Sequence, residues 1–116
     1  MLAGKYNIVC DQGSSFTRTL EIKTAQGTVF PLTGHTARME VRRTLDASTT
    51  IVSLTTANGR ISINGALGTI TLTLTAVETA ALTQSGVYDL EIVKTSTGEV
   101  FKVVRGEFKL EKEVSR

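Results

Sequence analysis

Apolar and polar positions alternate along most of the chain, and this alternation predicts short β-strands. Apolar residues recur at alternate positions in the segments around residues 6–10, 16–22, 37–41, 70–74 and 88–92, interrupted at Arg18, and the residues between them are mostly threonine or charged. A period of two places the apolar side chains on one face of a strand and the polar ones on the other. Glycine, asparagine and aspartate punctuate the pattern about every ten residues. We therefore expect seven to nine short strands.

One segment breaks this period. Between Thr75 and Leu82 the chain is rich in alanine, which favours helix. Thr75 followed three residues later by Glu78 is a capping-box pattern. We expect a short helical corner here, ended by Gly86. A corner of this kind just before a strand that carries Tyr88 is similar to the tyrosine corner of immunoglobulin-like domains, in which a tyrosine hydroxyl bonds back across the turn. The predicted fold is all-β, an immunoglobulin-like antiparallel β-sandwich.

The last strand changes phase. Core-type residues fall at odd positions at Phe101 and Val103 but at even positions at Phe108 and Leu110. A slip of one residue within a strand is produced by a β-bulge. Gly106 lies between the two halves and is the predicted bulge.

The length of 116 residues suits one domain with one core. Apolar residues make up 41% and charged residues 21%, which is the composition of a globular chain. We expect a single domain over residues 1–116. Its ends, residues 1–5 and 111–116, are expected to be arms that order only when a partner covers them.

Charge and cysteine content narrow the classes of partner. The formal net charge is only +2, so we expect neither nucleic acid nor a membrane surface as a partner. No apolar run approaches the roughly 20 residues that span a bilayer. The single cysteine, Cys10, has no internal partner, and no secretory signal opens the chain. We expect a protein made in a reducing cytoplasm.

Few residues offer chemistry. His35 is the only histidine and follows Gly34, which is typical of a loop residue. Cys10 has core parity, where thiols are usually inert. Asp89 and Glu91 share a strand face, which is ordinarily solvent-facing charge. We therefore expect no catalytic, cofactor-binding or metal site and no enzymatic activity, and a hydrolase that depends on His35 is the last alternative.

Three kinds of segment are candidate contact surfaces. Arginines lie on and after the strand predicted around residues 37–41, where interleaved acids favour either a soluble sheet surface or salt bridges between subunits. Two Asn-Gly turns and the two terminal arms are the others. The candidate interface residues are Lys5, Arg38, Arg42, Arg43, Asn58, Asn64, Lys112 and Arg116.

Four segments in order carry a resemblance to a known family. They are DQGSSF at 11–16, PLTGHTARMEVR at 31–42, GTITL at 68–72 and VYDLE at 87–91. Their order and spacing resemble small virion proteins of tailed bacteriophages. In particular, the chain is similar to the N-terminal domain of the phage baseplate upper protein family, which is an immunoglobulin-like sandwich. The likeness extends from about Tyr6 to Leu110.

The resemblance implies a structural role in the virion. Its members assemble with one another or with a tail, neck or capsid platform, so the expected partners are other virion proteins and further copies of this chain. The expected function is an assembly or adaptor module of the tail, baseplate or fibre-attachment region. A capsid decoration protein on the phage head is the first alternative. A carbohydrate-binding module at the host surface is the second, disfavoured by the absence of tryptophan and the low number of exposed aromatics expected.

Overall fold

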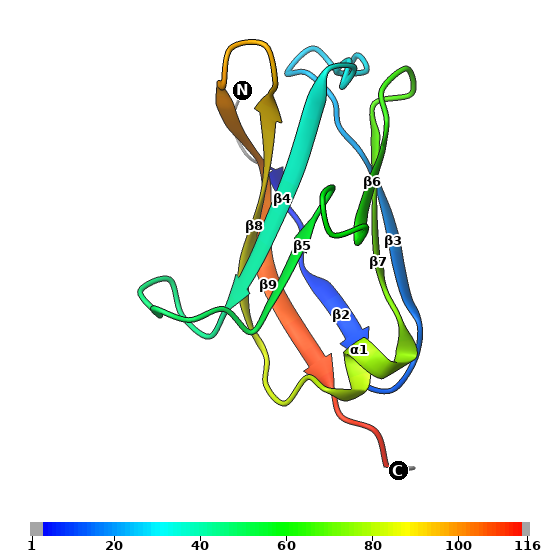
Figure 1. Ribbon diagram of the computed structural model, residues 1–116, viewed down its shortest axis with the longest axis vertical. Coiled ribbons are helices and arrows are strands. Elements are labelled where there is room, and N and C mark those ends of the chain that lie inside the picture. Colours follow the sequence, from blue (N-terminus) through cyan, green and yellow to red (C-terminus); the bar gives the residue numbers. More distant parts are fainter. Residues whose placement is uncertain (1–3, 115–116) are drawn as a thin grey trace.

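The computed structural model describes residues 4–114 and contains two facing β-sheets (Figure 1). The described chain forms nine strands and one short helix, as the alternating pattern predicted. The elements are β1 (Gly4–Lys5), β2 (Ile8–Asp11), β3 (Phe16–Glu21), β4 (His35–Arg42), β5 (Val52–Thr55), β6 (Ile61–Asn64), β7 (Thr69–Leu74), α1 (Ala76–Ala80), β8 (Gly86–Lys94) and β9 (Val100–Glu111).

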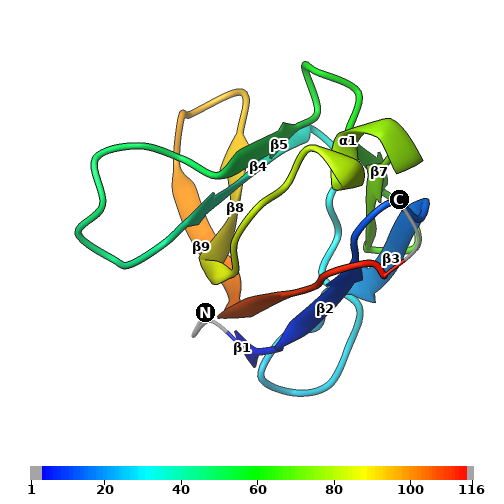
Figure 2. The ribbon, with the colours of Figure 1, turned by 90° about the horizontal axis from the view of Figure 1, so that it is seen from below.

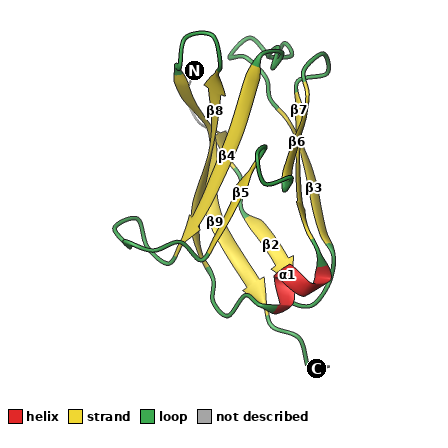
Figure 3. Cartoon of the chain, viewed as in Figure 1, coloured by secondary structure: helices red, strands yellow, loops and turns green. Residues whose placement is uncertain are grey.

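The strand order is that of an immunoglobulin-type sandwich. The larger sheet runs β1-β9-β8-β4-β5, with β2 also on β9, and the smaller runs β3-β7-β6. In immunoglobulin terms, β4, β8 and β9 occupy the C, F and G positions, and β3, β7 and β6 the B, E and D positions. Viewed along its length, the molecule shows the two sheets curving around a common interior (Figure 2). The predicted all-β sandwich with one helical corner, which Figure 3 shows as α1, is confirmed.

The sandwich is antiparallel as expected except at its first two strands. Strands β1 and β2 both pair with β9 in the parallel sense, with Ile8 opposite Phe108 and Cys10 opposite Leu110. Antiparallel pairing is imposed only where a short hairpin joins two strands. Strands β3 to β8 lie between β2 and β9 along the sequence, so no short hairpin constrains the direction of this pair. The larger sheet is therefore mixed.

The core is built from the predicted inward faces. In β7, Ile70, Leu72 and Leu74 are at most 1% exposed, while the threonines between them face outward. Phe16 of the smaller sheet meets Phe108 of the larger sheet edge to face, with 6.3 Å between ring centroids. Aromatic pairs in this geometry stabilise beyond the area that they bury, so this contact helps to join the two sheets.

Helix α1 closes one end of the sandwich. Thr75 is its N-cap, and the predicted capping box is complete because Glu78 and Thr75 each accept a hydrogen bond from the other's main-chain amide. Thr79 is fully buried, and its hydroxyl donates to the Ser14 carbonyl at 2.8 Å. The helix is thereby tied to the turn between β2 and β3.

The β-bulge lies at Val103, not at Gly106. Leu90 pairs with Val104 and Glu91 with Lys102, which leaves Val103 as the extra residue. Val103 and Val104 are therefore both buried, and this pair changes the phase of the strand.

Gly106 has a different role, because it permits a close approach of the chain between β1 and β2. It pairs regularly with Tyr88 in β8. A Cβ atom at this position would collide with the carbonyl oxygen of Tyr6 and would lie 2.9 Å from Oδ1 of Asn7. Glycine is used here so that the segment can lie directly against β9.

Tyr88 binds this same segment. Its hydroxyl donates to the Tyr6 carbonyl at 2.5 Å, while the side chain is only 5% exposed. Burial raises the pKa of the Tyr88 hydroxyl, so it remains protonated and can donate. The predicted tyrosine-corner bond across the preceding turn is therefore replaced by a bond to a residue 82 positions upstream.

We predict that Tyr88→Phe lowers the free energy of unfolding by about 1–2 kcal/mol, because the Tyr6 carbonyl loses a buried partner. Urea denaturation at neutral pH measures this. Tyr6→Phe is the matched control, since Tyr6 accepts this bond through its main chain and its side chain is 40% exposed. Equal losses in the two variants would show that the bond contributes nothing specific.

Candidate interaction surface

The outer face of the larger sheet gathers charged side chains from three strands. The β4–β8 register places Arg38 opposite Glu91 and Glu40 opposite Asp89. The β8–β9 register adds Lys102 and Arg105 beside them. The predicted candidates Arg38 and Arg42 therefore lie on one face, but with carboxylates between them.

These charges are mostly paired within the sheet. Nε of Arg38 lies 2.8 Å from Oε1 of Glu91, and Nζ of Lys102 lies 3.1 Å from Oδ2 of Asp89. Exposed ion pairs contribute about 0–1 kcal/mol each to stability. The face is thus better suited to matching charges on a partner than to holding the fold together.

A shallow hollow of about 270 Å³ lies on this face, beside the loop that joins β4 to β5. Its lining includes Val87, three charged residues (Arg42, Asp89 and Arg105) and Leu45 of the loop. Nη1 of Arg42 donates to the Ala47 carbonyl at 2.9 Å, which anchors the loop to the sheet. Arg42 is therefore a support for this loop as well as a surface charge.

Asn58 is exposed, but its side-chain amide is already hydrogen-bonded to the chain around it. Its Nδ2 donates to the Ser53 carbonyl at 3.1 Å, and its Oδ1 accepts from the amides of Thr55 and Arg60. Ser53 and Thr55 belong to β5, the edge strand of the larger sheet. An unpaired strand edge invites association with other chains, so Asn58 blunts this edge.

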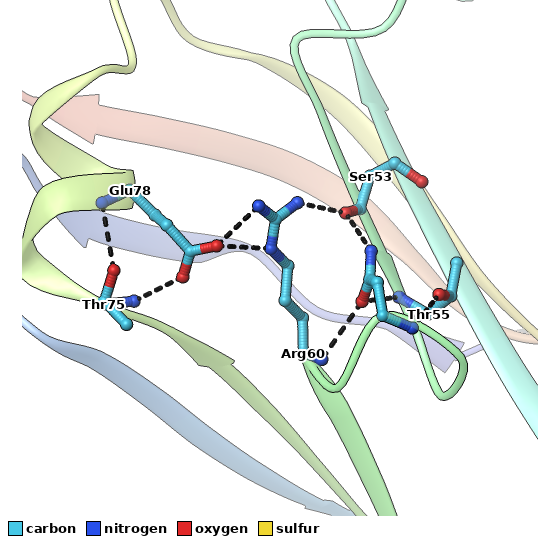
Figure 4. A network of polar contacts seen from close by, with 6 residues as sticks. Ser53, Thr55, Arg60, Thr75 and Glu78 are labelled. Carbon is cyan, nitrogen blue, oxygen red and sulfur yellow. Dashed lines mark hydrogen bonds and ion pairs between the residues drawn. The ribbon is translucent and has the colours of Figure 1, made fainter.

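Arg60 extends this arrangement to the helix, and the sequence reasoning missed it (Figure 4). Its Nη1 donates to the Ser53 carbonyl at 2.9 Å, and its Nε donates to Oε2 of Glu78 at 2.6 Å. The Glu78 carboxylate therefore serves both the helix cap and the β5 edge. The capping box could be predicted from the sequence, because its two residues are three positions apart. The contact between Arg60 and Glu78 could not, because 18 positions separate them and no local pattern links them.

The pKa of the Glu78 carboxyl is lowered, chiefly by the hydrogen bond from the Thr75 amide and further by Arg60. A carboxyl whose pKa is lower in the folded state contributes stability above its unfolded pKa and loses that contribution as pH falls through the folded pKa. We predict that Glu78→Gln is less stable than the unmodified chain at pH 7 by about 1 kcal/mol and equally stable once acid has protonated Glu78.

Thermal unfolding of both chains, measured from pH 7 down to the acid pH at which Glu78 is protonated, gives this difference in stability. Glu21→Gln is the control, because the ion pair of Glu21 within residues 4–114 is with the exposed Lys23. A stability difference for Glu78→Gln that is the same at neutral and acid pH would contradict the assignment.

The other candidate contacts are dispersed. Asn64 accepts a hydrogen bond from the Leu67 amide at 3.2 Å and so shapes its own turn. Lys5 is exposed in β1 beside Arg105, and Arg43 and Lys112 are exposed after β4 and β9. Arg116 lies outside the described residues. Within the expected arms, Gly4 and Lys5 form β1, and Glu111 is the last residue of β9.

Gln12 holds the chain where it leaves β9, and sequence reasoning saw it only as part of a turn. Its Nε2 donates to the Leu82 carbonyl at 2.7 Å, and its Oε1 accepts from the Glu113 amide at 3.0 Å. One amide side chain thus joins three segments that are distant in sequence. The segment DQGSSF at 11–16 predicted the turn but not the hydrogen bonds of Gln12 to Leu82 and Glu113.

His35 and Cys10 both make contacts within the fold. Nδ1 of His35 lies 3.1 Å from the Thr33 carbonyl, and its ring packs edge to face on Phe30. Cys10 is fully buried, and burial raises the pKa of its thiol. A thiol in this state is a poor nucleophile because little thiolate forms at neutral pH.

We predict that Cys10 reacts with a thiol reagent such as DTNB only as fast as the fold opens, because the reagent cannot reach a fully buried sulfur. Absorbance measurements of the native and urea-unfolded protein measure the two rates. Thr19→Cys in a Cys10→Ser background places a thiol on the exposed face of β3 and should react at once. Rapid labelling of native Cys10 would contradict the assigned burial.

Within residues 4–114, no group of three or more His, Cys, Asp or Glu side chains is placed to hold a metal ion. No helix in this part of the chain has the length and apolar character that crossing a membrane requires. In comparisons with known proteins, no protein-family model matches the chain, and no curated protein matches it at a significant level.

Proposed function

We propose that this protein is a non-enzymatic assembly module of a tailed-bacteriophage virion, acting as an adaptor in the tail, baseplate or fibre-attachment region. Its partners are other virion proteins and further copies of itself. It is made in the host cytoplasm and becomes part of the particle.

The outer face of the larger sheet is the observation that carries this proposal. Charges of both signs are held at fixed spacing on a hydrogen-bonded sheet, next to a loop whose Leu45 is 87% exposed. Complementary charge patterns give specificity and register to protein association, and an exposed apolar side chain beside them supplies a contact to bury. Together they favour a binding module over a module without partners.

The virion context is supported by the ordered resemblance of four segments. These segments cover the β2–β3 turn, β4, the start of β7 and β8, and so belong to both sheets. The role as a capsid decoration protein is the second candidate, because a small sandwich with a protruding loop also suits contacts between shell subunits.

The test is the copy number of this chain in purified particles, measured by quantitative mass spectrometry against the major capsid protein. We expect a few to a few dozen copies, because tail and baseplate platforms are small. Hundreds of copies would favour capsid decoration instead. Complete absence from particles would overturn the virion proposal.

A further inference from the structure

The loop between β4 and β5 carries a preformed apolar tip. Leu45 and Asp46 are the central residues of a turn closed by the bond from the Ala47 amide to the Thr44 carbonyl at 3.2 Å. Arg42 fixes the same turn through the Ala47 carbonyl. The loop stands away from the body of the sandwich (Figures 1 and 2). Because the turn is already ordered, little conformational entropy is lost when a partner covers it.

The hollow at the base of this loop can receive a side chain like the one that the loop presents. Val87 contributes an apolar side chain to its lining, and the volume is about 270 Å³. A cavity of about 150 Å³ accommodates benzene. The hollow therefore has room for an aliphatic side chain the size of leucine.

Arg105 lines the hollow, Lys5 lies beside Arg105, and these two cations match Asp46, the second residue of the tip. The carboxylates that also line the hollow are each in an ion pair within the sheet. Lys5 and Arg105 are adjacent in the β1–β9 register, and both are exposed. No ion pair joins either of them to another described residue, nor joins Asp46 to one. Adjacent like charges repel in isolation, so a carboxylate placed between them would be attracted.

We propose that two copies of this chain associate through the outer faces of their larger sheets, each inserting Leu45 over Val87 of the other and placing Asp46 against Arg105 and Lys5. Tip and hollow lie on the same surface of one chain, which is the requirement for a two-fold symmetric contact. The contact deepens the proposed assembly function by naming one surface between copies, but it requires no other virion protein.

Sedimentation velocity on the purified chain, from micromolar to millimolar concentration, tests the proposal. We expect a reversible monomer–dimer equilibrium that Leu45→Ser weakens by about tenfold or more, as for a central apolar anchor. Val77→Ser is the matched control and should leave the equilibrium unchanged, because Val77 is 81% exposed on α1, away from this face. Circular dichroism confirms that each variant is folded.

A charge exchange separates this contact from any other dimer. Asp46→Lys and Arg105→Glu should each weaken association, and the double variant should recover affinity because the pair is re-formed with opposite sign. A chain that stays monomeric throughout the concentration range would overturn the proposal, as would a dimer that is indifferent to Leu45→Ser or shows no recovery. Since the measurement uses the chain alone, its failure is distinct from absence of the protein from virions.

Discussion

The parallel ladder between β2 and β9 is the contact on which the rest of the sandwich depends. It joins the first part of the chain to the last, and it carries Ile8 and Cys10 into the core beside Phe108. Two further features serve the same contact: Gly106 lets the Tyr6–Asn7 segment lie against β9, and the hydroxyl of Tyr88 binds the Tyr6 carbonyl. A pairing between residues so distant in sequence costs loop-closure entropy, which the contacts of the folded chain offset. The ladder therefore couples the stability of both ends to that of the whole domain.

A polar network closes the opposite side of the sandwich, where β5 leaves the larger sheet exposed at its edge. Asn58 and Arg60 cover the Ser53 carbonyl, and Glu78 joins Arg60 to the N-terminus of α1. The result is an edge that cannot readily accept another strand. This protection disfavours strand addition at β5 as a mode of association.

The two outer faces differ in chemistry, and this difference directs the functional proposal. On the smaller sheet the outward residues of β3 and β7 are mainly threonines, with Thr19 and Thr71 hydroxyls 3.1 Å apart. The larger sheet presents charges of both signs and the protruding Leu45 turn. Cross-strand threonine pairs stabilise a sheet locally. Charges on a rigid face can instead discriminate between partners, so the larger sheet is the better candidate for recognition.

The sequence by itself determined the elements of this protein, and the tertiary structure decided how distant elements meet. Alternation fixed the faces of β4 and β7, and the Thr75–Glu78 spacing fixed the start of α1, because both patterns are local. The candidate arginines Arg38 and Arg42 were correctly expected to share a face, since they lie four positions, an even number, apart on one strand. Their carboxylate and loop partners, the parallel sense of β2, the bulge at Val103 and the bridging role of Gln12 all involve residues far apart in the chain. No local pattern encodes these contacts, because they arise only when both sheets bury their apolar faces together.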